Sequence, residues 1–193
     1  MTDPFALFTD WFVQAKQTEL VDPEAMCVAT VNALGYPSTR MVLLKGHDER
    51  GFVFYTNSHS QKARDIAENP HVSLCFHWKA IRKQIRILGA CVPVSSEEAD
   101  VYFSRRSRES RLGAWASDQS ALLDTRETFL AHIAAVTTQF EGKDVPRPPH
   151  WWGYRVVPTH IEFWEDRPHR LHDRTVFTRK TLEESWQIHK LYP

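Results

Sequence analysis

The 193-residue sequence has few cysteines, no excess of charge and no long apolar run. The three cysteines, Cys27, Cys75 and Cys91, lie in apolar strand-like segments without a Cys-x-x-Cys pair, which argues against disulfides, metal binding or redox chemistry. Lysine plus arginine equals aspartate plus glutamate at 24 each, so no overall field attracts nucleic acid or an acidic membrane. Any anion site must therefore be local.

The chain also lacks the signatures of targeting and membrane segments. Residues 1–5 have neither the basic nor the apolar region of a signal peptide, and no apolar run approaches the length of a membrane span. We therefore expect a cytoplasmic protein without membrane or nucleic-acid partners. Its length fits a single domain over residues 1–193, large enough to bury about 70% of its unfolded surface.

The hydrophobic pattern changes period several times along the chain. Asp3 followed by Pro4 predicts a helix over residues 4–18, and a helical insertion is expected at about 95–140, with its second long helix over 122–140. Alternating or apolar runs predict strands on either side of this insertion: 26–31, 38–45, 51–56, 72–78, 83–94 and a C-terminal group within 151–193. Many antiparallel strands with grouped helices indicate an α+β fold built on a split β-barrel.

Residues 170–174, Arg-Leu-His-Asp-Arg, are the most informative short segment. They follow an alternating run at 161–164, and in an extended strand Arg170, His172 and Arg174 would project from one face. Such a face suits anionic or electron-rich groups. Taken alone, it is better explained as a solvated edge strand whose arginines pair with nearby carboxylates.

Other clusters offer cations with polar neighbours. Arg40 and Lys45 bracket an apolar strand on opposite faces, and residues 58–62 open a short helix where free N–H groups and a lysine could hold a phosphate. Three residues spaced four apart would share one face of a continuous helix: Tyr102, Arg106 and Ser110. Each cluster alone is also explained by ordinary strand-end charges, helix capping or helix-surface charge.

In their order along the chain, these segments resemble the FMN-dependent pyridoxine (pyridoxamine) 5'-phosphate oxidases. The matching segments cover nearly the whole chain: 40–45, 54–57, 83–86, 102–103, 113–120, 146–149, 162–164, 170–174 and 191–193. Such ordered agreement is far more specific than any one short motif. The resemblance implies a split β-barrel that forms a homodimer with FMN at the subunit interface.

The resemblance also implies roles for individual residues. FMN would be contacted by Arg40, Met41, Val42, Leu43, Leu44, Lys45, Tyr55, Thr56, Gln61, Lys62, Gln84, Gln119, Ser120, Trp164 and Arg174. The substrate phosphate would be bound by Lys45, Tyr102, Arg106 and Ser110. Arg170 and His172 would be the catalytic pair that faces the pyridine ring and its reacting 4' substituent. Two phosphates thus require two separate cation clusters.

The implied reaction transfers a hydride from the 4' carbon of pyridoxamine or pyridoxine 5'-phosphate to FMN. Oxygen then reoxidises the flavin and becomes hydrogen peroxide, and no metal is required. The alcohol gives pyridoxal 5'-phosphate directly, whereas the imine formed from the amine is hydrolysed by water to pyridoxal 5'-phosphate and ammonia. Two alternatives stay open from the sequence. One is a related split-barrel flavin oxidase with a phenazine-type substrate, and the other is a non-catalytic carrier of FMN or pyridoxal phosphate.

At three positions the residue differs from the one that is usual in the family. Gln61 stands where arginine is usual, which predicts weaker FMN binding. Trp152 occupies a position where a small residue is common, so this position either needs no positive φ or is remodelled. Ser107 replaces a usual proline, which predicts a looser loop around Arg106.

Overall fold

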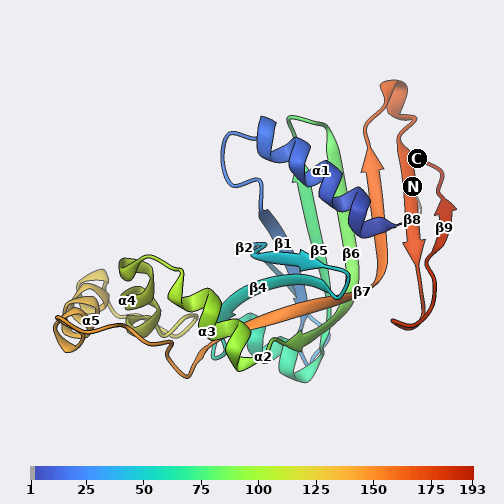
Figure 1. Ribbon diagram of the computed structural model, residues 1–193. Helices are drawn as coiled ribbons and strands as arrows, with labels where there is room; N and C mark the ends of the chain where they lie inside the picture. The colour runs from blue at the N-terminus through green and yellow to red at the C-terminus, as the bar shows by residue number, and fades with distance from the viewer. Residues whose placement is uncertain (1–2) are drawn as a thin grey trace.

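The computed structural model describes residues 3–193. One nine-stranded antiparallel sheet runs in the order β2-β1-β5-β6-β7-β4-β3, with β8 paired to β7 and β9 paired to β8. The strands are β1 (Ala25–Val31), β2 (Pro37–Leu43), β3 (Gly46–Asp48), β4 (Gly51–Asn57), β5 (His71–Trp78), β6 (Lys83–Pro93), β7 (Trp151–Glu165), β8 (Asp173–Thr178) and β9 (Gln187–Lys190). The sheet curls into a half-barrel (Figure 1), which confirms the predicted α+β split β-barrel.

Helices lie at both ends of this sheet (Figure 1). They are α1 (Pro4–Thr18), α2 (Gln61–Glu68), α3 (Ser96–Ser104), α4 (Arg108–Ala116), α5 (Arg126–Gln139) and the short 3-10 turn η1 (Pro168–Arg170). None of the helices within residues 3–193 combines the length and the apolar character needed to cross a bilayer.

Helix α1 covers the core on one side of the half-barrel. Its start follows the predicted signal, because the Asp3 carboxylate accepts a hydrogen bond from the Phe5 N–H at 2.9 Å and Pro4 occupies the first turn. Phe8 is fully buried and makes edge-on contacts with Phe52 and Phe76, with ring centroids 4.8 and 5.3 Å apart. Burial of each such ring contributes about 2–3 kcal/mol of hydrophobic stabilisation.

Strand β7 connects two distant parts of the molecule. Its first residues pair with β4, from Trp151 opposite Asn57, and its last residues pair with β8, with Glu165 opposite Asp173. A register shift beside β6 occurs at Gly89, where a Cβ atom would lie 2.1 Å from the Val157 carbonyl oxygen. The bulge therefore requires glycine, and it allows the long strand to bend from one part to the other.

The helical insertion differs from its predicted form at a break after α3. The chain leaves the helix at Ser104, and α4 begins at Arg108, where the Ser107 hydroxyl accepts a hydrogen bond from the Ser110 N–H at 3.2 Å. A continuous helix was the condition under which Tyr102, Arg106 and Ser110 would share one face, and this condition is not met. Helix α5 also starts later than residue 122, because Thr125 is its N-cap.

The segment 170–174 is not an extended strand. His169 and Arg170 have φ values of 57° and 63°, in the left-handed region, and β8 begins only at Asp173. These residues reverse the chain between β7 and β8, so the predicted strand face shared by Arg170, His172 and Arg174 is wrong. Their side chains are instead distributed around a tight turn.

Candidate active site

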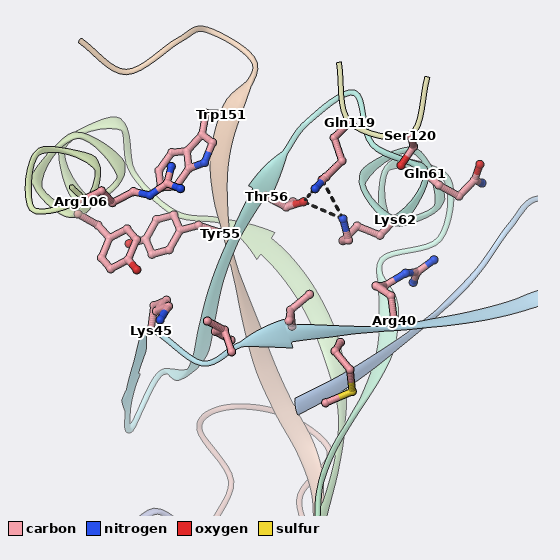
Figure 2. A pocket seen from close by; sticks show the side chains of 14 residues that line it. Arg40, Lys45, Tyr55, Thr56, Gln61, Lys62, Arg106, Gln119, Ser120 and Trp151 are labelled. Carbon is pink, nitrogen blue, oxygen red and sulfur yellow. Dashed lines mark hydrogen bonds between the residues drawn. The ribbon is translucent and has the colours of Figure 1, made fainter. Parts of the chain in front are cut away.

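A cavity of about 520 Å³ opens among β2, β4, α2, α3 and the segment after α4 (Figure 2). Cations stand at its two ends, and the aromatic rings gather at the end that holds Arg106. Its lining comprises Arg40, Met41, Val42, Leu43, Lys45, Tyr55, Thr56, Gln61, Lys62, Tyr102, Arg106, Gln119, Ser120 and Trp151. The cavity therefore brings together most of the residues that the family resemblance placed against FMN or substrate.

Lys62 occupies one end of the cavity and has no anionic hydrogen-bond partner. Its side chain comes from the first turn of α2, and the residue is only 7% exposed. Nζ donates to the Thr56 hydroxyl at 2.9 Å, the Gln119 side-chain oxygen at 3.0 Å and the Ser60 hydroxyl at 3.3 Å, all neutral acceptors. Burial, with a smaller effect of the Arg40 charge, lowers the pKa of Lys62 to about 8. Such an ammonium is suited to an incoming anion.

Arg40 lies beside Lys62, and the buried Asp65 carboxylate orients its guanidinium through the Thr30 hydroxyl. Arg40 Nη1 donates to the Thr30 hydroxyl at 2.7 Å, and that hydroxyl donates to Asp65 at 2.6 Å. Asp65 is 2% exposed and also accepts a hydrogen bond from Gln61 Nε2 at 2.7 Å. The network fixes the direction of the guanidinium while leaving Lys62 without an ionic partner of its own.

Arg106 occupies the other end of the cavity in a desolvated position. Its guanidinium lies 5.0 Å from the Trp151 ring centroid and 5.6 Å from that of Phe103. Nη1 is buried and has no hydrogen-bond partner within residues 3–193. Burial lowers the pKa of Arg106, which nevertheless stays charged at neutral pH. A buried donor without an acceptor is costly, and an anionic ligand would offset that cost.

Stacked rings form a wall of the cavity beside Arg106. The Tyr55 ring lies parallel to that of Tyr102 at a centroid distance of 4.1 Å and to that of Trp151 at 4.9 Å. Burial raises the pKa of Tyr55 to about 12, so its hydroxyl stays protonated at neutral pH. Trp151 was not among the predicted site residues. Its place at the start of a strand beside β4 could not be read from local periodicity.

A second group of predicted site residues lies at the turn between β7 and β8. Trp164 pairs with Gln84 on β6 and with Arg174 on β8, and the His172 ring lies 4.6 Å from the Trp164 ring. Figure 1 shows this turn and helices α3 to α5 at opposite ends of the molecule. These residues and the exposed Arg170 do not line the cavity of their own chain.

The charges in this turn are neutralised locally. Arg174 Nε donates to the buried Glu162 carboxylate at 2.7 Å, and His172 Nδ1 lies 3.0 Å from an Asp166 oxygen. Arg167 pairs with Asp173 at 2.6 Å. The turn therefore holds Arg167, His172 and Arg174 in defined directions, whereas the exposed Arg170 has no ion pair within residues 3–193.

Two models of known families match the chain, and together they span most of its length. Residues 12–140 match the model described as pyridoxamine 5'-phosphate oxidase, and residues 151–193 match the pyridoxine 5'-phosphate oxidase C-terminal dimerisation region. The chain belongs to the pyridoxamine 5'-phosphate oxidase family. It is accordingly an oxidoreductase.

Similar proteins agree with this assignment. The chain is 56% identical to a pyridoxine/pyridoxamine 5'-phosphate oxidase of Sphingopyxis alaskensis, over 99% of this chain and 88% of the relative. It is also 56% identical to that of Gluconobacter oxydans, over 99% of this chain and 94% of the relative. A solved structure of PhzG from Burkholderia lata 383, in complex with tetrahydrophenazine-1-carboxylic acid, is 33% identical with a TM-score of 0.93 and covers 100% of this chain and 94% of that one.

The remaining predicted residues lie near the cavity or in the core. Ser110 lines an adjoining pocket that shares Tyr55, Arg106 and Trp151 with the main cavity. Leu44 is 5% exposed and belongs to the hydrophobic core, so its side chain does not line the cavity.

The structure shows the surroundings of the three residues that differ from those usual in the family. Gln61 is exposed and bound to Asp65, so a charge there would be partly solvated. Trp152 has no positive φ, and its Nε1 donates to the Val94 carbonyl at 3.2 Å. Ser107 is the N-cap of α4, so its side chain has a structural role at this position.

FMN fits the residues that the cavity presents. Its phosphate would meet the buried Lys62 ammonium and the oriented Arg40 guanidinium, which have room for an anion in their charge balance. Gln119 and Thr56 offer neutral polar groups beside this end. The donor set therefore suits a phosphorylated cofactor with an uncharged polar chain.

Proposed function

We propose that the chain catalyses the FMN-dependent oxidation of pyridoxamine 5'-phosphate and pyridoxine 5'-phosphate to pyridoxal 5'-phosphate, with oxygen as acceptor and hydrogen peroxide as product. One observation carries the proposal: each end of a single cavity has a buried or partly buried cation, Lys62 or Arg106, with no anionic hydrogen-bond partner among residues 3–193. A cofactor phosphate and a substrate phosphate together satisfy both.

At the Lys62 end, Arg40, Lys62 and Ser120 would hold the FMN phosphate, and Thr56 and Gln119 would contact the adjoining polar chain. Bound FMN would supply the two-electron acceptor for the hydride leaving the 4' carbon of the substrate, and oxygen would remove those electrons. The protein contributes binding and orientation, because a phosphate fixed at one end determines where the flavin ring must lie.

At the other end, Arg106 would bind the substrate phosphate with help from Lys45, Tyr102 and Ser110. Lys45 Nζ lies 3.8 Å from the Glu24 carboxylate, so its charge is partly balanced, whereas Arg106 has an unused buried donor. Arg106 therefore supplies the principal attraction for the phosphate. The parallel rings of Tyr55 and Tyr102 line the space beside it.

The site is completed by a second copy of the chain in a homodimer, with FMN at the interface. Residues 151–193 match the family's dimerisation region, and they include the β7–β8 turn. Met41 and Leu43 on the cavity rim are 64% and 36% exposed, apolar surface that a partner would cover. Trp164 and Arg174 of one copy, with Gln84, would then meet the flavin held by the other copy.

Arg170 and His172 would reach the substrate ring in the same way. Asp166 and Trp164 hold the His172 imidazole from two sides, so its direction is set before substrate binds. We assign Arg170 and His172 the orientation of the reacting 4' substituent over the flavin.

An aerobic assay tests this proposal. FMN-loaded protein is mixed with each phosphorylated vitamer, and aldehyde absorbance and peroxide are followed together. Equal amounts of pyridoxal 5'-phosphate and peroxide are expected. Flavin-loaded protein that forms neither product contradicts the proposal, and binding of pyridoxal phosphate without turnover would identify a carrier.

The PhzG structure gives a specific reason to test a second substrate class. PhzG was solved with a tetrahydrophenazine carboxylic acid, and its overall likeness to this chain is high. The same assay with that compound separates the two classes. Peroxide from the phenazine compound but not from the phosphorylated vitamers would assign the enzyme to the phenazine class.

A further inference from the structure

We propose that Trp151 and Gly153, at the start of β7, are positioning residues for the substrate-phosphate end of the cavity. They act through Arg106 and Tyr55. The inference rests on the proposed function, because it takes the anion bound at this end to be the phosphate ester. Neither residue belongs to the set that the family resemblance places against FMN or substrate.

Trp151 determines the environment of Arg106. The indole is 7% exposed, and its ring centroid lies 5.0 Å from the Arg106 guanidinium carbon. An aromatic face attracts a guanidinium and also keeps water from one side of it. Because Arg106 Nη1 is buried without a partner within residues 3–193, it can still donate a hydrogen bond to a ligand. Without the indole, water could hydrate the guanidinium and let it change direction.

Trp151 also supports the wall that contains Tyr102. Its ring is parallel to that of Tyr55 within 5°, and Tyr55 is parallel to Tyr102 within 4°. The centroids of Trp151 and Tyr102 are 6.0 Å apart. A displacement of one ring therefore displaces the others. Tyr102 and Arg106, two of the groups proposed to bind the phosphate, would move with them.

Gly153 allows the wall to form, because it leaves space for the Tyr55 ring. The two residues are direct partners between β4 and β7. A Cβ atom at position 153 would lie 2.5 Å from Tyr55 Cε1, 2.7 Å from Tyr55 Cδ1 and 2.7 Å from Val94 Cγ2. The φ of Gly153 is not positive, so space and not backbone conformation requires glycine here. Any side chain would push Tyr55 out of the stack.

Gly46 provides the matched control on a neighbouring strand. A Cβ atom there would lie 3.8 Å from Val53 Cβ, an ordinary van der Waals contact. Gly46→Ala should therefore leave both substrate and flavin binding unchanged, whereas Gly153→Ala should weaken substrate binding more than flavin binding.

The experiment measures three quantities on each FMN-loaded protein: the Kd for pyridoxal 5'-phosphate, the KM for pyridoxamine 5'-phosphate and, after flavin removal, the Kd for FMN. Trp151→Leu should raise the first two about tenfold, the size of one desolvated cation–π contact, and raise the FMN Kd by a clearly smaller factor, because Trp151 contacts Arg106 directly and the flavin site only through Tyr55. Trp151→Phe keeps a flat ring beside Arg106 and should recover most of the loss. A merely structural role would not separate the two ligands in this way.

A double-mutant cycle tests whether Gly153 acts through Tyr55. Gly153→Ala should raise the KM about tenfold in the native background, the same order as loss of the indole contact, and have a smaller further effect once Tyr55→Ala has removed the ring that the new methyl group meets most closely. Wild-type protein that binds pyridoxal phosphate, with Trp151→Leu and Gly153→Ala binding it equally well, overturns the inference and leaves the proposed function intact. Wild-type protein that neither binds nor oxidises the phosphate esters overturns both.

Discussion

The cavity and the β7–β8 turn each contain several cationic side chains. The two regions differ in whether these side chains have anionic partners. In the cavity, Lys62 has only neutral acceptors and Arg106 has a buried donor without a partner. In the turn, Arg174 is paired with Glu162 and His172 with Asp166. Unneutralised buried charge prepares a region to receive anions, whereas paired charge fixes the direction of a side chain. The two regions thus perform different physical tasks within one proposed site.

The largest expected effect comes from removing the charge that has no partner. Arg106→Ala should raise the KM for pyridoxamine 5'-phosphate roughly 30- to 150-fold, the equivalent of about 2–3 kcal/mol for a charge-assisted contact. Steady-state kinetics measure the change. Arg105→Ala is the control, because Arg105 is the exposed residue that ends α3. Equal effects of the two substitutions would show that Arg106 has no special role.

Substitution of a paired cation in the turn should lower the stability of the protein as well as its affinity for FMN. Arg174→Ala leaves Glu162, which is 3% exposed, with only Arg86 at 3.5 Å, and should reduce the free energy of unfolding by about 2 kcal/mol. Urea denaturation measures this loss, and flavin fluorescence should show weaker FMN binding. Arg167→Ala removes exposed ion pairs and should leave the midpoint unchanged. An unchanged midpoint for Arg174→Ala would contradict the account of the turn.

FMN binding should depend on pH through Lys62. Because the pKa of this ammonium is lowered to about 8, the charge that attracts the phosphate is present below pH 8 and is lost as the pH rises through that value. The affinity of the apoprotein for FMN should be constant near pH 7 and then fall, approaching about tenfold per pH unit above 8. Fluorescence titration from pH 7 to 9.5 measures it. In Lys62→Arg the charge persists, so a fall of equal steepness there would exclude Lys62 as its source.

The smallest expected effect concerns Gln61. Gln61→Arg should tighten FMN binding about two- to fivefold, because the position is exposed and a new charge there would be well solvated. Asp65 lies 2.7 Å from the present side chain and would attract part of the new charge. Titration of the apoprotein measures the change, and unaltered affinity would mean that position 61 does not contact the phosphate.

Local signals in the sequence were sufficient for much of the fold. The helix start at Asp3 and Pro4 depends on neighbouring residues, and so does the alternation of β6, in which Ile85 and Ile87 are buried while Arg86 is exposed. The split barrel follows from the order of such elements. The cavity residues were found through the family resemblance, which preserves contacts between segments distant in sequence.

The failures of prediction occurred where non-local structure or rare backbone conformations decide the outcome. Alternation suggested a strand through residues 170–174, but two successive left-handed residues, His169 and Arg170, form a turn that periodicity does not reveal. Ser107 caps a new helix, so the condition for a shared face of Tyr102, Arg106 and Ser110, one continuous helix, is not met. Trp151 was missed because its role depends on β4 and α3, which are remote in sequence.

The central claim is that the cavity of one chain and the turn of another form one active site, and complementation tests it most directly. Arg106→Ala and His172→Ala chains are each prepared with FMN, unfolded and refolded together, and assayed with pyridoxamine 5'-phosphate. If the site is shared, half of the sites in mixed dimers contain neither substitution, and random mixing should restore about a quarter of wild-type activity. If each site belongs to one chain, every site retains a defect, and activity no higher than that of the separate variants would contradict the account.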